Sequence, residues 1–218
     1  MINFFKTSTF LTLLFLTYSY SLSAQQWSRT WYPGHLVSIS GDTLEGDLRY
    51  DIENDAVQIR LENERVHTFS GKKVLTFEIQ EHPRRSKRRF YALPYEQRNS
   101  FFTSRLFEVL YEGKLTLLCR PYMEHINNVD TREDDSGKKK NDPYYEYYFL
   151  NDDGIVHLYR PRLGRLLSFM SAKHRDVRNY MRQHHLRYDQ MRDLVRITAY
   201  YNALPAASSP KEQTLQPE

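Results

Sequence analysis

The sequence predicts an α+β fold, namely a mainly antiparallel β meander, rolled sheet or half-barrel of about eight strands followed by two or three C-terminal helices. Three observations support this prediction. Short runs of alternating apolar and polar residues follow one another from residue 34 to residue 159. Turn-forming residues separate these runs, and beyond Leu163 the apolar residues recur every three or four positions.

The first hairpin is the clearest element. Two alternating runs, Leu36–Ile39 and Leu44–Tyr50, flank Gly41 and Asp42. Gly41 can adopt the positive φ that a tight turn needs, and Asp42 can hydrogen-bond to the backbone near it. The two runs are therefore expected to pair as antiparallel strands. The polar residues of this stretch are interpreted as turn chemistry and a solvent-facing side.

The same alternation predicts strands over residues 56–61, 66–70, 74–80 and 90–93. Pro94 ends the last of these runs and indicates a sheet edge, because proline cannot donate to a ladder. The β part closes with two further hairpins, over 106–120 and 144–159. The first of them is the most apolar part of the sheet, so we expect it at the centre of the core.

Residues 162–204 are predicted to be helical, with a break near His185 and with Asp189 as the N-cap of the last helix. Packing against the sheet is the expected role of these helices, and binding of a partner is the alternative. The β domain is placed at 25–161. The polar loop 124–143 inside it and the tail 205–218 are expected to be disordered.

The first 24 residues have the pattern of a signal peptide. Lys6 precedes the apolar run Phe10–Tyr18, and small residues follow at Ser21–Ala24. The apolar run is too short for a transmembrane helix. We therefore expect export across the inner membrane, and a mature protein that is periplasmic or associated with the outer membrane or cell surface. An integral membrane protein is not expected.

Charge and cysteine content narrow the class of protein further. The chain has 31 Lys and Arg against 27 Asp and Glu, a formal net charge of +4. This balance does not favour nucleic acid as a partner. The single cysteine, Cys119, lies in an apolar run and so favours a buried structural role without a disulfide.

A basic run supplies the first candidate contact, formed by Arg84, Arg85, Lys87, Arg88 and Arg89. It would suit an anionic lipid, a polysaccharide or an envelope protein. The alternative is a loop whose charges only discourage edge-to-edge pairing of strands.

Tyrosines supply the second candidate contact. On a strand, Tyr145 and Tyr147 share one face while Tyr144 and Tyr148 share the other. One of these pairs is therefore expected to be exposed and available to a ligand, with Tyr145 and Tyr147 as the candidates.

Catalytic and metal-binding motifs are missing from the sequence. It has no Gly-rich phosphate loop, no H-E-x-x-H and no cysteine pair. No catalytic residue, cofactor or metal is therefore predicted. Four glutamates on or beside strands, Glu78, Glu81, Glu108 and Glu112, leave open an alternative function, a hydrolase of envelope glycans or peptides.

Four segments resemble a group of uncharacterised, signal-peptide-bearing proteins of Gram-negative bacteria. They are Gly34–Tyr50 with its G-D-T-L-x-G hairpin, Val74–Phe77, Phe107–Gly113 and Tyr200–Asn202. The resemblance covers most of the chain after residue 24 and implies a cell-envelope setting, a β meander and a helical end. It supplies no catalytic residue. The predicted function is therefore a non-enzymatic, secreted or envelope-associated binding or structural module that contacts an anionic envelope component.

Overall fold

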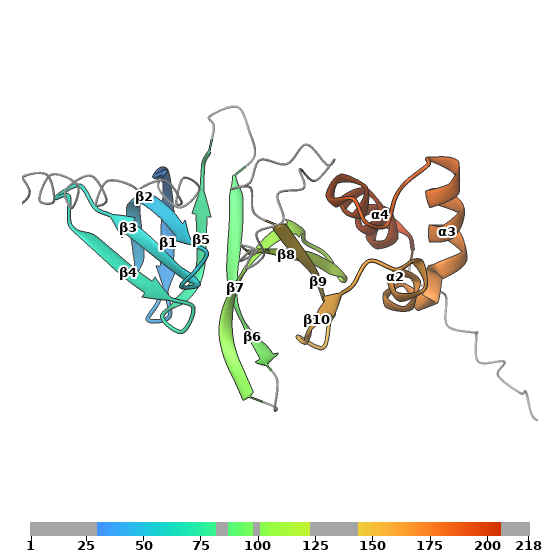
Figure 1. Ribbon diagram of the computed structural model, residues 1–218, viewed down its shortest axis with the longest axis horizontal. Helices are drawn as coiled ribbons and strands as arrows, with labels where there is room; N and C mark the ends of the chain where they lie inside the picture. Colours follow the sequence, from blue (N-terminus) through green and yellow to red (C-terminus); the bar gives the residue numbers. More distant parts are fainter. Residues whose placement is uncertain (1–29, 82–86, 98–100, 123–143, 206–218) are drawn as a thin grey trace, which may run out of the picture.

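The computed structural model describes residues 30–81, 87–97, 101–122 and 144–205. Within these ranges ten antiparallel strands form one open sheet in the order β10-β9-β8-β7-β6-β5-β1-β2-β3-β4, and helices follow at the C-terminal end (Figure 1). The α+β prediction is confirmed, with ten strands where about eight were expected. The predicted signal peptide, the loop 124–143 and nearly all of the tail lie outside the described residues.

The sheet elements are β1 (Tyr32–Ser38), β2 (Thr43–Asp51), β3 (Ala56–Arg60), β4 (Val66–Ser70), β5 (Val74–Ile79), β6 (Arg88–Gln97), β7 (Phe101–Tyr111), β8 (Thr116–Tyr122), β9 (Tyr144–Leu150) and β10 (Val156–Tyr159). The helical elements are α2 (Leu163–Phe169), the short 3₁₀ helix η3 (Ser171–Lys173), α3 (His174–Gln183) and α4 (Met191–Ala203). No helix among the described residues is long and apolar enough to span a bilayer.

The first five strands curl into a unit that we call the N-terminal roll. In its order, β5-β1-β2-β3-β4, the two outermost strands are β4 and β5, yet the short turn at Gly71–Lys73 joins them. A short turn can connect the two outermost strands, β4 and β5, only if the sheet curls and brings them close together. The side chains inside the curve form the roll cluster: Leu36, Leu48, Tyr50, Val57, Ile59, Val74, Phe77, Ile79, Phe90 and Leu106.

Two glycines explain the G-D-T-L-x-G pattern as a structural motif. Gly41 has a φ of 91°, and the Ser38 N–H donates to Asp42 O at 2.9 Å across the turn. Gly46 lies in β2, where a Cβ would stand 2.3 Å from Arg60 O on β3. The first glycine turns the chain and the second lets two strands approach closely. The predicted hairpin is therefore confirmed.

The prediction that the strand ends at Pro94 is wrong, although the strand does have one unpaired side at this residue. β6 continues to Gln97 and lies between β5 and β7. β6 pairs with β5 only over Arg88–Tyr91, whereas its pairing with β7 runs on through Pro94 opposite Ser104. One side of β6 is therefore free of a strand neighbour at Pro94, and the strand tolerates the missing N–H there.

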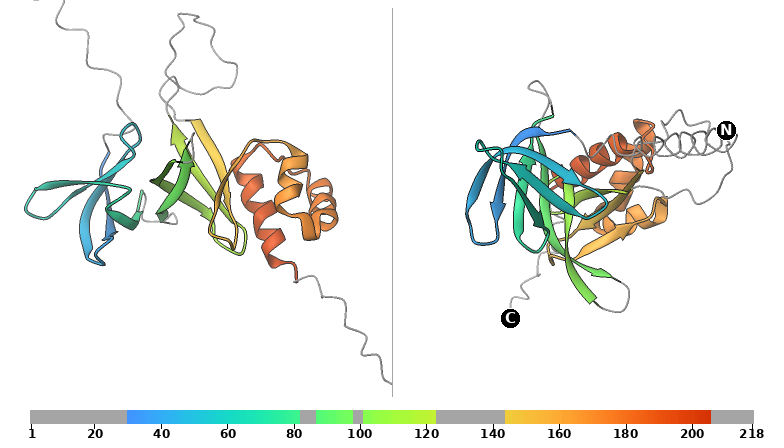
Figure 2. Two further views of the ribbon diagram at one scale, coloured as in Figure 1. Left: turned by 90° about the horizontal axis from the view of Figure 1, so that it is seen from below. Right: turned by 60° about the vertical axis from the view of Figure 1, so that its left-hand side comes forward.

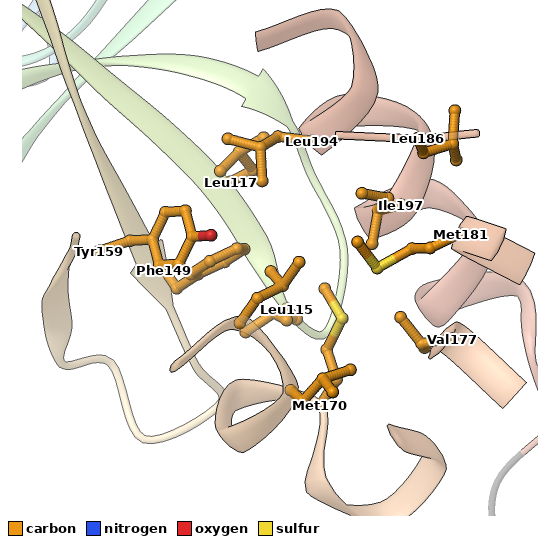
Figure 3. Packing of buried hydrophobic residues seen from close by; sticks show 12 residues of the cluster. Leu115, Leu117, Phe149, Tyr159, Met170, Val177, Met181, Leu186, Leu194 and Ile197 are labelled. Carbon is orange, nitrogen blue, oxygen red and sulfur yellow. The ribbon is translucent and has the colours of Figure 1, made fainter. Parts of the chain in front are cut away.

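The helices cover the sheet at its other end, as expected. α4 lies against β7 and β8, and α3 packs outside it on α2 and α4 (Figure 1). Figure 3 shows the side chains that meet there. We call them the helix cluster: Leu115, Leu117, Phe149, Tyr159, Leu166, Leu167, Met170, Val177, Met181, Leu186, Leu194 and Ile197.

The predicted helix break is confirmed, but the predicted cap is wrong. α3 ends at Gln183, His185 has a φ of 52°, and α4 begins at Met191. The N-cap of α4 is Gln190, which makes no side-chain capping bond. The Asp189 carboxylate instead accepts two hydrogen bonds from the guanidinium of Arg187, at 3.1 and 3.0 Å.

The β7–β8 hairpin joins all the apolar clusters of the protein. Leu106 belongs to the roll cluster, and Leu117 to the helix cluster. Phe107 and Leu118 belong to a third cluster on the other face of the sheet, completed by Tyr148 and Val156. The prediction that this hairpin lies at the centre of the core is thus confirmed.

Asn202 fastens the last helix to the same hairpin. Its side chain accepts from the Leu115 N–H at 3.0 Å and donates to Leu115 O at 2.9 Å and to Thr198 O at 2.9 Å. Two residues earlier, Tyr200 stacks on Tyr180 of α3 with ring centroids 3.9 Å apart. The Tyr200–Asn202 segment of the resemblance therefore has structural roles.

Candidate functional site

The predicted basic run is only partly described, because Arg84 and Arg85 lie outside the described residues. Arg88, at the start of β6, donates two hydrogen bonds to Glu108, at 2.7 and 2.8 Å, and also pairs with Glu81. Burial by itself lowers the pKa of Arg88, but the hydrogen bonds and charges of the two glutamates outweigh it and raise that pKa. Arg88 is therefore an internal ion-pair partner.

Arg89 points to the opposite face of the sheet and is also paired. Its guanidinium donates to Glu78 at 2.6 Å and to Glu112 at 3.0 Å, and Lys87 lies 3.8 Å from Glu78. The hydrogen bond from Arg89 is the main cause that lowers the pKa of Glu78. The described part of the basic run therefore joins β5, β6 and β7, and its charges are met by carboxylates of the same chain.

The four glutamates of the hydrolase alternative are the same carboxylates. Glu81 and Glu108 pair with Arg88, and Glu78 and Glu112 pair with Arg89. Cys119 lies beside this group, with its Sγ 3.6 Å from Glu108. Burial raises the pKa of the Cys119 thiol well above its ordinary value, so the thiol stays protonated and unreactive.

The expectation of an exposed tyrosine pair is wrong. Tyr145 and Tyr147 are half-buried, and Tyr147 packs against the helix cluster. Burial raises the pKa of each to about 12. On the other face, Tyr148 is buried and donates to Glu146 at 2.8 Å, so neither pair forms an open platform.

A second buried charge group clamps the roll to the centre of the sheet. Asp55, in the β2–β3 turn, accepts from Tyr50 at 2.8 Å and from Arg105 of β7 at 3.3 Å. Arg120 of β8 lies 3.2 Å from the same carboxylate. Because the carboxylate is met by two arginines and a hydroxyl, this group has the character of a structural clamp.

Unpaired positive charge gathers instead on the C-terminal helices. Between Arg160 and Pro205 the chain has ten Arg and Lys residues against three Asp residues. On α3, Arg175, Arg178 and Arg182 are exposed and are spaced three and four residues apart. This spacing puts them on one side of the helix, which we call the arginine stripe.

The arginine stripe lies away from the core. Val177 and Met181, on the other side of α3, are buried in the helix cluster. None of the three arginines has an acidic partner within 4 Å among the described residues, and the only side-chain bond of the stripe joins Arg182 to Asn179 at 2.6 Å. α3 is also the outermost helix, at one end of the molecule (Figures 1 and 2).

Sequence reasoning overlooked the arginine stripe, although a signal was present. Basic residues outnumber acidic residues by a larger margin in residues 160–205 than in the chain as a whole. The consecutive run at Arg84–Arg89 is the more conspicuous pattern in the sequence, whereas charges that share one side of a helix are three and four residues apart.

Two open hollows, of about 410 and 400 Å³, lie on the surface of the described residues. The first is lined by the paired residues Glu78, Arg89 and Glu112. The second lies between hairpin turns and helices, and its Lys173 and Asn202 are bound to backbone carbonyls. In the described ranges no three His, Cys, Asp or Glu side chains are placed to hold a metal ion.

Comparisons with protein-family models, curated proteins and solved structures gave no significant match to this chain.

Proposed function

We propose that the protein is a non-enzymatic module of the cell envelope whose C-terminal helices bind the phosphate groups of anionic lipid headgroups. One observation carries this proposal: the arginine stripe of Arg175, Arg178 and Arg182 is exposed on the outermost helix and has no carboxylate partner among the described residues. The arginines on the sheet are, by contrast, used within the fold.

A guanidinium matches a phosphate because it can donate two parallel hydrogen bonds to its oxygens. Arg192 is exposed on α4 and adds positive charge to the same helical end, whereas Arg196, also exposed, lies 3.9 Å from Asp193. The apolar sides of these helices are already buried in the helix cluster. Binding would therefore be electrostatic, without insertion of side chains into the acyl region, and would weaken as salt is added.

The envelope setting of the proposal is supported by the signal-peptide pattern of residues 1–24 and by the resemblance to secreted proteins of Gram-negative bacteria. An enzyme would need titratable groups that converge in a cavity. The carboxylates of the first hollow are instead held by arginines.

The test compares two variants that lose the same charge at opposite ends of the molecule. In the first, Arg175, Arg178 and Arg182 are all changed to Ser. In the second, the matched control, Arg65, Lys72 and Lys73 at the N-terminal roll are changed to Ser; all three are exposed. Binding of the purified protein to vesicles of phosphatidylglycerol and phosphatidylcholine is measured by co-sedimentation at low and high salt.

At about 1 kcal/mol for each basic residue near an anionic surface, the first variant should lose roughly a hundredfold in affinity at low salt. The control should bind nearly as well as the unchanged protein, and pure phosphatidylcholine vesicles should bind neither. Equal losses in the two variants would mean that only net charge matters, and would overturn the proposal. Binding to an acidic polysaccharide without binding to vesicles would overturn it as well.

A further inference from the structure

Among the described residues, the outer strand of the N-terminal roll has a free edge. There β4 ends the sheet and pairs only with β3, and it lies at the end of the molecule opposite the helices (Figure 1). Val66, His67, Thr68 and Ser70 are all exposed, Val66 by 51%. At the other end of the sheet, β10 buries both Val156 and Tyr159. The side chains of the edge strand β4 are thus mostly exposed, whereas the edge strand β10 is partly buried.

The backbone pattern shows which groups point away from β3. The Leu61 N–H donates to Arg65 O at 3.1 Å, and these two residues lie opposite each other in the continued β3–β4 register. In an antiparallel ladder hydrogen-bonded pairs alternate with non-bonded pairs. His67 and Phe69 therefore bond to β3, while Val66 and Thr68 direct their N–H and C=O groups to the open side.

Charges at the two ends of β4 are opposite and uncompensated. Glu62 and Glu64 precede the strand and outnumber Arg65, which lies directly before Val66, so the net charge at this end is negative; Lys72 and Lys73 follow the strand. The two glutamates and the two lysines are exposed, and none of them has an ion-pair partner within 4 Å in the part of the chain that the structure describes. A second β4 laid antiparallel along the edge would place the glutamates of each copy beside the lysines of the other. A parallel arrangement would bring like charges together.

The strand also lacks the usual protection against such pairing. It contains no Lys and no Pro, and the β3–β4 ladder has no bulge. Soluble proteins commonly use these features to keep exposed edges from pairing. Their absence makes the edge available to another strand.

We infer that β4 pairs with β4 of a second copy of this chain, antiparallel and centred on His67, so that the sheet continues across a two-fold axis. In this register Val66 of one copy lies opposite Thr68 of the other, and the two pairs make four backbone hydrogen bonds. A register centred on Thr68 would need Ser70, whose C=O already accepts from the Lys73 N–H at 2.9 Å. The interface is small, so the dimer is weak and forms at high concentration.

The first experiment uses the symmetry of this pairing. His67 would face His67 of the second copy at a Cα separation of about 4.5 Å, within the range of a disulfide. His67→Cys should therefore form covalent dimers rapidly under mild oxidation. The native Cys119 is buried and adds no background. Ile39→Cys, at a residue that is 65% exposed in the β1–β2 turn, is the matched control and should dimerise slowly.

The second experiment tests the backbone bonds and the charges without cross-linking, by sedimentation equilibrium in the absence of lipid. Thr68→Pro removes an N–H that points outward, so the protein should fold and remain monomeric. Glu64→Lys and Lys72→Glu should each weaken the dimer, and the double variant should restore it.

Two results would overturn the inference: a wild-type protein that stays monomeric at millimolar concentration, or equal rates of cross-linking at positions 67 and 39. Unfolding of Thr68→Pro would do the same, because it would show that the Thr68 N–H is bonded to β3. The control variant of the vesicle test removes Lys72 and Lys73, which belong to this interface. Vesicle binding is therefore measured at micromolar protein, well below the concentration at which the weak dimer forms, so the failure of either proposal is separate from that of the other.

Discussion

The N-terminal roll and the helix-covered end bury apolar residues to a similar degree but use their arginines differently. In and beside the roll, Arg105 and Arg120 converge on Asp55, and Arg88 is enclosed by Glu81 and Glu108. On the helices Arg175, Arg178 and Arg182 are exposed and lack carboxylate partners among the described residues. Arginines on the sheet therefore hold strands together, whereas the arginines of the stripe are exposed to solvent, where we propose that they bind lipid phosphates.

The physical reason lies in desolvation. A guanidinium that is partly buried in a sheet loses water and must be paired, because an unpaired buried charge costs several kcal/mol. A guanidinium on an outer helix keeps its water and needs no partner. Internal pairing is thus a property of position. The three arginines of the stripe have kept their water, and their shared side of α3 is the basis of the proposed anion-binding surface.

The largest expected effect tests whether the two ends fold together. Phe77 stacks on Phe90 in the roll with centroids 4.4 Å apart, and Leu194 is fully buried in the helix cluster. Phe77→Ala should reduce the free energy of unfolding by about 3–5 kcal/mol, and Leu194→Ala by about 2–5 kcal/mol. Because the β7–β8 hairpin contributes residues to every cluster, both variants should shift a single thermal transition, followed by circular dichroism.

Two separate transitions in Leu194→Ala, an early loss of helix and a later loss of sheet, would break this expectation. They would show that the helices are a unit which can leave the sheet. The proposed lipid-binding surface would then belong to a separable segment.

A smaller effect is expected from Asn202→Ala. This change removes the two hydrogen bonds that join α4 to Leu115 and a third, within α4, to Thr198 O. At about 0.5–1.5 kcal/mol for each bond, the free energy of unfolding should fall by roughly 1–3 kcal/mol. This change in the free energy of unfolding is measured by urea denaturation. Asn179→Ala, on the exposed side of α3, is the control and should change stability by less than about 0.5 kcal/mol. Equal effects at the two positions would rule out a stabilising role for the Asn202 hydrogen bonds.

Local patterns predicted most of the fold because they depend on neighbouring residues. The turn at Gly41, the hairpin at Gly113 and the helical period after Leu163 are all short-range signals, and the structure confirms each. The pairing of β1 with β5 is not such a signal. It depends on how far the sheet curls, which no run of residues within β1 specifies.

The charged groups were predictable only in part, for a similar reason. Whether Arg88 is free depends on Glu108, twenty residues away and on the next strand. The sequence shows both residues but not their distance. The arginine stripe, by contrast, depends on spacing within one helix, so the sequence alone contained enough information to predict it.

The smallest expected effect is a loss of stability at high pH, and it tests which of the two ends of the molecule opens first. Burial raises the pKa of Tyr147, beside the helix cluster, from 10.0 to about 12. In the roll, burial and the nearby charge of Asp55 raise the pKa of Tyr50 still further. A raised tyrosine pKa means that folding favours the neutral phenol. The contribution of Tyr147 to stability is therefore fully present below pH 10 and is lost as the pH rises from 10 to 12.

Tyr147→Phe keeps the ring and removes this titration, so its thermal midpoint should fall less than that of the unchanged protein between pH 10 and 12. Tyr188→Phe, at an exposed position, serves as control and should follow the unchanged protein. Hydrogen exchange of the backbone amides between pH 10 and 12 shows which elements open first. Because Tyr147 ionises before Tyr50, α4 and β9 should lose protection before β2 does. Earlier exchange in β2 would show that the roll, and not the helical end, is the first part of the molecule to open.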